Sequence, residues 1–193
     1  MKRLPGLCYF AGILLILLSL GLLAGSLLRT QYAQKQNAAV TAQLRARMPD
    51  RAVGVAGDYS DREMPILQLD GTDFVCLLEV PGLGVVLPVG NRWESDALQD
   101  HPCRFWGSIY DGSCILGGSG RQGQFDFCAR LDLGDTILLT DMGGVEFSCS
   151  VRKIERSKTA DFERLWDADY PLTLFVRQEY SSEYIIVRCE WCA

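Results

Sequence analysis

An apolar segment without charges opens the chain, since residues 4–28 contain no Asp, Glu, Lys, Arg or His. As an α-helix rising about 1.5 Å per residue, the segment would extend about 37 Å, enough to cross a hydrocarbon core of about 30 Å. A cleaved signal peptide is the alternative, because Lys2 and Arg3 form a basic start and residues 24–26 are small. The apolar run exceeds the roughly 7–15 residues usual for such a peptide. We therefore expect a single-pass transmembrane helix that is retained.

The charges that flank this segment are balanced, because Arg29 and Lys35 offset Lys2 and Arg3. Orientation then depends on the very short N-terminal tail, which most simply stays inside. The sequence therefore predicts a cell-membrane protein whose C-terminal domain lies on the extracytoplasmic side.

A polar region follows the apolar segment. Residues 31–48 are rich in Ala and Gln, lack Gly and Pro, and end at Pro49, which predicts a helical stalk. Residues 53–65 contain Gly, Asp and Ser and indicate a linker. We therefore expect three parts, listed in chain order: a membrane anchor (1–28), a stalk and linker (29–65) and a folded domain (66–193).

The pattern from residue 66 onward predicts mainly β structure. Residues 136–140 and 145–154 flank the turn sequence Asp-Met-Gly-Gly, which is typical of a hairpin. Two short helices are expected, at residues 94–99 and 161–167. Further strands are expected at residues 74–80, 85–89, 113–116, 172–176 and 184–189. Seven or eight short strands at this spacing favour a closed or nearly closed β-barrel.

Composition limits the classes of function. The net charge of −5 gives no basic patch of the kind that binds nucleic acid, so we expect no nucleic-acid partner. The chain holds eight cysteines but only one CxxC motif, which ends at Cys192. A zinc site of four thiolates would need a second motif, and a redox motif would open a helix, so structural thiols are favoured. We expect neither a metal nor another cofactor.

Five segments resemble successive motifs of sortases, in particular class B-like sortases. They are Leu-Glu-Val-Pro-Gly-Leu-Gly-Val-Val-Leu-Pro-Val (78–89), Pro-Cys-Arg-Phe-Trp-Gly-Ser-Ile-Tyr (102–110), Leu-Asp-Leu-Gly-Asp-Thr-Ile-Leu-Leu-Thr-Asp (131–141), Leu-Thr-Leu-Phe (172–175) and Val-Arg-Cys-Glu (187–190). They occur in family order, and the resemblance covers roughly residues 66 to 191. It implies an eight-stranded β-barrel behind a membrane anchor and stalk. Sortases are cysteine transpeptidases that join secreted proteins to the cell wall or to pilin.

The resemblance also identifies the catalytic positions. In sortases a Cys attacks a peptide carbonyl, a His protonates the leaving amine and an Arg binds the oxyanion. In this chain the His position falls on Gly118, the Cys position on Arg177 and the Arg position on Tyr184. A shift of one residue would move the last position to Glu183. None of these residues can perform the required role, which implies an inactive protein with these four residues as candidates for the former groove.

Other residues are poorly placed to replace the missing groups. The single histidine, His101, belongs to an upstream segment, so we expect it to be solvated or structural. Cys114 shares a strand face with Gly118, but four residues at about 3.3 Å place it about 13 Å away, too far for attack. We expect Arg177 to be solvated or paired with a nearby glutamate, Glu179 or Glu183. We also expect the thiols of Cys103 and Cys189 to lie close together.

Three hypotheses for function follow. The first is a non-catalytic sortase-like protein that binds a sorting-signal peptide, a pilin or an active sortase. The second is an enzyme with rebuilt chemistry that uses Cys114 or Cys103 with His101. The third is a structural barrel whose groove is filled and whose binding surface lies elsewhere.

Overall fold

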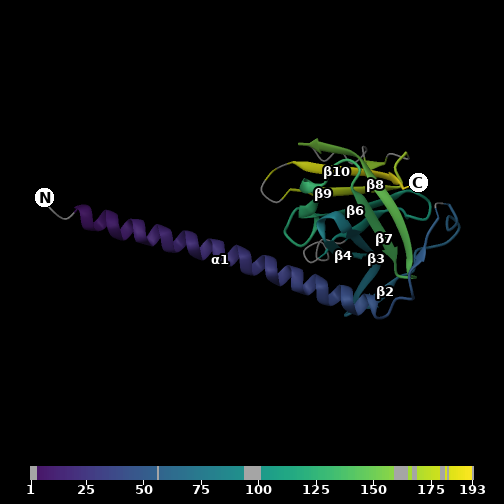
Figure 1. Ribbon diagram of the computed structural model, residues 1–193, viewed down its shortest axis with the longest axis horizontal. Coiled ribbons are helices and arrows are strands. Elements are labelled where there is room, and N and C mark those ends of the chain that lie inside the picture. Colours follow the sequence, from purple (N-terminus) through teal and green to yellow (C-terminus); the bar gives the residue numbers. More distant parts are fainter. Residues whose placement is uncertain are drawn as a thin grey trace. The chain divides into compact units, whose positions relative to one another are not determined.

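The computed structural model describes residues 4–55, 57–93, 101–158, 165–166, 169–178, 181 and 183–192. The chain divides into two units, residues 1–36 and residues 37–193. The first unit contains most of a single helix, α1 (Leu4–Arg45), and the second contains the end of α1 and all the strands (Figure 1).

α1 is one continuous helix of 42 residues. Pro5 lies in its first turn, where the missing N–H would have no helical partner in any case. The helix expected over residues 31–48 is confirmed as far as Arg45. Large apolar side chains in its N-terminal half are exposed, Leu14 at 69% and Leu17 at 61%. Within the part of the chain that the structure describes, no helix combines the length and apolarity needed to cross a membrane.

The last turns of α1 pack against the domain that follows. Leu44 is fully buried in a small cluster that includes Phe74, Leu77 and Met142. The last turn also forms an ion pair, between Arg45 Nη2 and the Glu79 carboxylate at 2.9 Å. Residues 37–45 are therefore part of the folded domain.

Eight strands close into a barrel. The order around the ring is β8-β10-β9-β6-β5-β4-β3, and β7 closes it by pairing with both β3 and β8 (Figure 1). The remaining two of the ten strands, β1 (Ala52–Val53) and β2 (Leu67–Leu69), each pair with one barrel strand only. The barrel strands are β3 (Thr72–Val80), β4 (Val85–Gly90), β5 (Cys103–Trp106), β6 (Cys114–Ser119), β7 (Thr136–Asp141), β8 (Val145–Ser157), β9 (Leu172–Arg177) and β10 (Tyr184–Trp191). The expected eight-stranded barrel is confirmed.

Local sequence explains several of these elements. The hairpin predicted around residue 142 joins β7 to β8, and Gly144 takes the positive φ of +81° that the turn requires. Strand β5 was not predicted, because four residues carry too little alternation to stand out. The two helices predicted at residues 94–99 and 161–167 lie largely outside the described residues. The short helices that the structure describes are 3₁₀ turns, η1 (Pro81–Leu83) and η3 (Phe125–Arg130).

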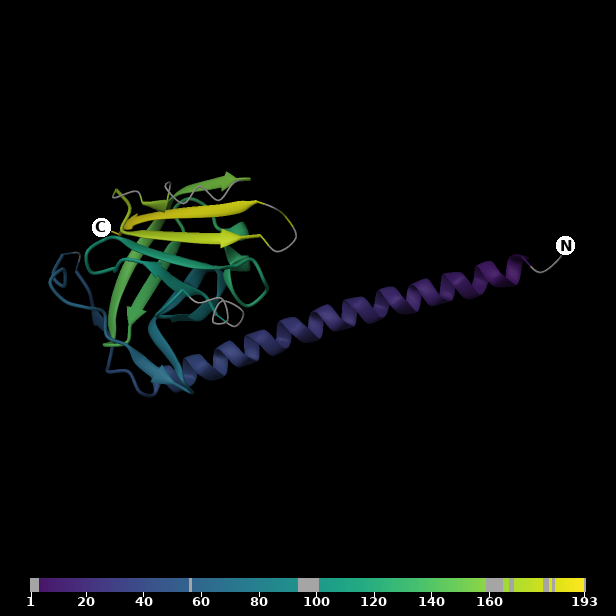
Figure 2. The same cartoon turned by 180° about the vertical axis from the view of Figure 1, so that it is seen from behind.

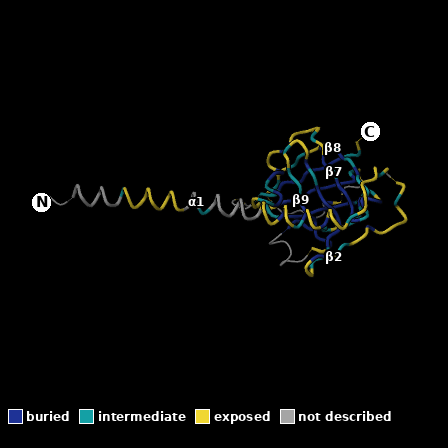
Figure 3. The backbone as a smooth tube through the Cα atoms, turned by 60° about the horizontal axis from the view of Figure 1, so that its bottom comes forward, coloured by how far each residue is buried: buried dark blue, intermediate teal, exposed yellow. Residues whose placement is uncertain are grey.

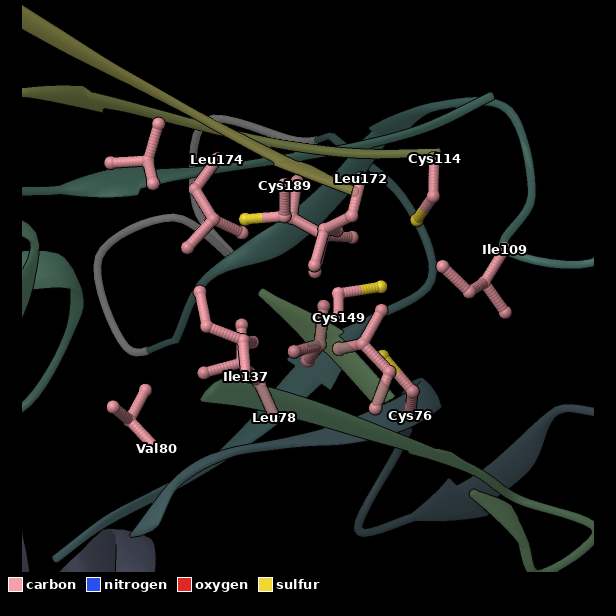
Figure 4. Close-up of a cluster of buried hydrophobic side chains, with 14 of the residues drawn as sticks. Cys76, Leu78, Val80, Ile109, Cys114, Ile137, Cys149, Leu172, Leu174 and Cys189 are labelled. Atoms are coloured by element: carbon pink, nitrogen blue, oxygen red, sulfur yellow. The ribbon is translucent and has the colours of Figure 1, made fainter. Parts of the chain in front are cut away.

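Side chains from every barrel strand except β5 fill the interior, and the buried segments gather there (Figure 3). Five cysteines belong to this core, Cys128 among them. The other four lie among aliphatic side chains in Figure 4: Cys76, Cys114, Cys149 and Cys189. No disulfide joins the cysteines that the structure describes.

The expected proximity of Cys103 and Cys189 is wrong. Cys189 faces the barrel interior, whereas Cys103 lies outside the interior cluster, with its sulfur 3.6 Å from His101 Nδ1. Strands β6 and β9 also separate the two residues in the sheet. Strand order and side-chain direction thus keep the two thiols apart.

Candidate functional site

The candidate positions meet where β6, β9 and β10 lie side by side. Arg177, the last residue of β9, pairs directly with Tyr184, the first residue of β10. On its other side Arg177 pairs with Ser119 of β6, and Gly118 precedes Ser119. Adjacent strands are about 4.8 Å apart. The structure therefore brings Gly118, Arg177 and Tyr184 together, as the resemblance requires. Strands β9 and β10, whose ends meet there, are the yellow strands of Figure 2.

Gly118 faces the barrel interior. A Cβ atom on Gly118 would lie 3.0 Å from the Phe125 ring and 3.3 Å from Pro102, and Phe125 belongs to the core. Side chains alternate between the two faces of a strand, so the next residue, Ser119, shares the outer face with Arg177. Ser119 is thus a site residue that the sequence did not reveal. An alignment of motifs matches positions along the chain but does not show which face of a strand each side chain occupies.

A loop holds Ser119 in place. The Ser119 hydroxyl donates to Gln124 Oε1 at 2.6 Å, and the Ser119 backbone N–H donates to the same oxygen at 3.1 Å. The adjacent carbonyl, that of Gly123, accepts a hydrogen bond from the Asn37 side chain of α1. The last turns of α1 therefore contact the loop that positions Ser119.

Aromatic side chains cover the outer face beside these strand ends. The rings of Tyr184 and Phe175 stack in parallel, with centroids 5.4 Å apart and an interplanar angle of 6°. Trp93 lies over Gly117, where no larger residue would fit, and contacts Phe105 edge-on at 5.2 Å. We call this set the outer aromatic face: Trp93, Phe105, Trp106, Trp166, Phe175 and Tyr184. Sequence reasoning missed it, because its members come from distant segments.

Arg177 is exposed at the edge of this face. No ion pair joins it to a carboxylate among the described residues. Glu183, one of the two expected partners, is held through its backbone, whose N–H donates to Ser181 Oγ and whose carbonyl accepts from the Gln178 N–H, each at 3.0 Å. The other expected partner, Glu179, lies outside the described residues. The exposure of Arg177 agrees with the solvated alternative, and pairing with Glu179 stays a prediction.

His101 and Cys103 lie close together at the start of the neighbouring strand β5, where Cys103 pairs with Gly117 of β6. The His101 ring is buried and packs edge-on against Phe74, with centroids 5.1 Å apart. Cys103 is fully buried beside it. A Cβ atom on Gly90 would lie 3.0 Å from His101 and 3.1 Å from the Cys103 sulfur, so both side chains pack tightly on the β4 backbone. The structural role expected for His101 agrees with this packing.

Cys114 lies inside the barrel. Burial is the main cause that raises the pKa of its thiol from 9.0 to about 12, and the nearby Asp111 raises it further against the opposing effect of Arg104. A thiol with that pKa is almost entirely protonated at neutral pH, and the thiolate is the reactive form. Cys114 is therefore unsuited to act as a nucleophile.

The described residues of the outer row are polar. The outer row of Ser119, Arg177 and Tyr184 holds a hydroxyl, a guanidinium and a phenol, with neither a thiol nor an imidazole among them. Ser119 has no imidazole partner, since the only histidine is His101. Among the residues described, no group of three or more His, Cys, Asp or Glu side chains is arranged to hold a metal ion.

No protein-family model and no curated protein matches the sequence. Solved structures do match the fold. Sortase C of Clostridium perfringens, determined with the C-terminal cell-wall sorting motif, is 15% identical with a TM-score of 0.57, over 82% of this chain and 98% of that one. A lid mutant of sortase A from Corynebacterium diphtheriae is also 15% identical with a TM-score of 0.57, over 84% and 95%.

A third similar structure is the sortase D5 transpeptidase of Clostridium perfringens. It is 18% identical with a TM-score of 0.54, over 63% of this chain and 80% of that one. At these identities the comparison establishes the fold and not the chemistry. Together with the closed ring of eight strands, it shows that this chain has the sortase fold.

Proposed function

We propose that this protein is a non-catalytic, sortase-like binding protein that is anchored in the cell membrane and holds a peptide segment of a cell-wall or pilin protein on its extracytoplasmic side. The observation that carries the proposal is the outer row at the strand ends. A guanidinium occupies the position that the resemblance assigns to the nucleophile, and Ser119 and Tyr184 flank it. Arginine stays protonated and offers no nucleophilic lone pair.

The outer aromatic face also supports a binding function. Trp106 is 57% exposed, Trp166 51% and Trp93 37%, although burial would be favourable for each ring. Exposed aromatic side chains that lie next to polar groups are typical of binding surfaces. A recess at Gly117 is ruled out by the Trp93 ring, so we place the ligand on the aromatic face itself and not in a deep groove.

The anchor is part of the proposal. Residues 4–28 lack charge, and the exposed apolar side chains between Ile13 and Leu20 need a non-aqueous environment. We assign this segment to the membrane, with the domain outside the cell. After expression in a Gram-positive host, the protein should stay in the membrane pellet through alkaline carbonate washing, and external protease should digest the domain on intact protoplasts. Release by carbonate or protection from protease would contradict this assignment.

Peptide binding is tested with the full chain in detergent micelles. Fluorescein-labelled peptides of the LPxTG and NPxTN types serve as probes, and fluorescence anisotropy reports binding. We expect one of the two to bind, and Trp93→Ala to weaken it at least tenfold, since central aromatic side chains dominate binding energy. Leu133→Ala is the matched control, because Leu133 is 69% exposed and outside the aromatic face. Absence of binding by both peptides would refute the proposed function.

The rebuilt-enzyme hypothesis has one supporting observation, the contact of 3.6 Å between His101 Nδ1 and the Cys103 sulfur. A Cys–His pair is the usual unit of thiol activation. Both residues are buried in the structure, however, and neither belongs to the exposed row of Ser119, Arg177 and Tyr184. We therefore keep Cys103→Ala as a control variant in every activity measurement.

A further inference from the structure

Arg177, at the edge of the outer aromatic face, differs from the arginines that form ion pairs within the barrel domain. Arg45 and Arg51 contact Glu79, and Arg188 contacts Glu155 at 3.0 Å. Arg177 is exposed, and no described carboxylate forms an ion pair with it. Its charge therefore contributes no ion pair to the described part of the fold and is available to an anion from outside.

The neighbours of Arg177 form a polar rim. Ser119 lies about one strand spacing of 4.8 Å away on one side, and Tyr184 lies at the same spacing on the other. The hydroxyl of Ser119 is fixed by Gln124, and the ring of Tyr184 is fixed by its stack on Phe175. The rim is therefore held in place before any ligand arrives, which lowers the entropic cost of binding.

The aromatic rings begin where the rim ends. From Tyr184 the contacts run through the buried Phe175 to Trp93 and on to Phe105, with centroid distances of 5.4, 6.4 and 5.2 Å. The rings that this chain leaves exposed to a ligand are those of the tryptophans: Trp93, Trp106 and Trp166. A ligand that covers the rings and reaches the guanidinium must have an apolar part several residues long and an anionic group at one end. An extended peptide with a free C-terminal carboxylate has this form.

The geometry points to a carboxylate site at Arg177, and we propose that the ligand is an extended peptide whose free C-terminal carboxylate pairs with this guanidinium while the preceding residues lie on the outer aromatic face. The inference rests on the proposed peptide-binding function and specifies its ligand. Guanidinium and carboxylate match as a planar, two-bond pair. The C-terminal carboxylate is preferred over an acidic side chain because Arg177 lies at a strand end, at the edge of the rings and not among them.

The test uses the full chain in detergent micelles and three fluorescein-labelled peptides. The first is Leu-Pro-Ala-Thr with a free carboxylate, the second is the same peptide with a C-terminal amide, and the third is Leu-Pro-Ala-Asp with a C-terminal amide. Fluorescence anisotropy measures each dissociation constant at low and at high salt. We expect the first peptide to bind at least tenfold more tightly than the second, and the difference to shrink in high salt because the site is exposed.

Variants assign the preference to one residue. Arg177→Gln should remove the difference between carboxylate and amide, and Arg177→Lys should retain part of it, since a lysine keeps the charge without the planar fork. Arg152→Gln is the matched control, because Arg152 is an exposed strand arginine with only a surface contact to Glu190 at 3.4 Å.

The outcomes separate this inference from the proposed function. Equal binding of the first two peptides, or a preference that survives in Arg177→Gln, overturns the carboxylate site and leaves peptide binding intact. Tighter binding of the third peptide than of the first overturns the choice of a C-terminal carboxylate. Absence of binding by all three overturns the carboxylate site and counts against the proposed function as well.

Discussion

Gly118 and Ser119 are neighbours on β6 and face opposite sides of the strand, so only one of them reaches the candidate site. Gly118 matches the family's histidine in sequence, yet its Cβ position lies 3.0 Å from Phe125 in the core. Ser119 is the residue that pairs with Arg177 on the outer face. The interior behind Gly118 is therefore filled by a core side chain.

We predict that Gly118→His lowers the free energy of unfolding by about 1–3 kcal/mol, the usual cost of overpacking a core. Ser119→His should cost less, because Ser119 is only half-buried and faces outward. Urea unfolding followed by circular dichroism measures both. If Gly118→His were as stable as the parent protein, the packing of Phe125 against Gly118 would be wrong.

The interior thiols give the protein a pH-dependent stability. Burial is the largest contribution for Cys149, and the neighbouring thiols Cys114 and Cys192 add to it, so the pKa of Cys149 rises from 9.0 to about 12. Cys114 has a similar pKa of about 12, mainly through burial. In the unfolded chain both thiols ionise near pH 9.0, whereas in the folded protein they keep their protons to about pH 12.

The free energy of unfolding should therefore be insensitive to these thiols below pH 9 and fall as pH rises from 9 towards 12. The unfolded state binds fewer protons in this range, so each thiol contributes a decrease of up to about 1.4 kcal/mol per pH unit. Urea titrations under reducing conditions at a series of pH values measure the slope. Cys114→Ala should make the slope of the unfolding free energy against pH shallower. An unchanged slope would show that folding does not raise the pKa of Cys114.

At the scale of elements, the end of α1 belongs to the barrel domain. Leu44 is buried among the side chains of β2, β3 and the β7–β8 turn. Asn37, two turns earlier, binds the carbonyl of Gly123 in the loop that holds Ser119. The helix that continues into the apolar segment therefore also supports the candidate site.

We predict that Leu44→Ala costs about 2–5 kcal/mol of stability, the range for a truncated core leucine. Gln43→Ala, an exposed position on the same turn, is the control and should change stability by less than about 0.5 kcal/mol. Thermal unfolding of the full chain in detergent compares the two. Equal effects of both variants would mean that the helix does not pack on the barrel.

Elements with a strong local pattern were predictable from the sequence. The β7–β8 hairpin has alternating strands and a Gly-rich turn, and β9 and β10 are apolar runs. The register between β6 and β9 was not predictable, because these parallel strands are more than fifty residues apart and only their pairing in the barrel fixes it. The predicted approach of Cys103 to Cys189 was wrong for the same reason. The order of strands in the ring places β6 and β9 between them, and the sequence does not show that order.

At the scale of the whole molecule, a closed barrel leaves its strand ends and outer faces available for function. The ring of eight strands places β6, β9 and β10 next to one another, so that segments more than fifty residues apart meet at one edge. The fold therefore fixes where these strand ends meet, whichever residues occupy them. The sortase fold alone does not decide between the two roles, and the residues at the strand ends do.

We propose that this protein binds sorting-signal peptides and does not cleave them. Nucleophile, acid and oxyanion donor act as one unit, and removal of a single member typically lowers the rate by several orders of magnitude. The most direct measurement is mass spectrometry of LPxTG and NPxTN peptides after prolonged incubation with the full chain in detergent, with and without an amine acceptor.

We expect that both peptides are recovered uncut and that the protein carries no thioester adduct. An active sortase assayed in parallel shows that the peptides are competent substrates. Cleavage by this chain that disappears in the Cys114→Ala or Cys103→Ala variant would contradict the account and establish a rebuilt thiol enzyme.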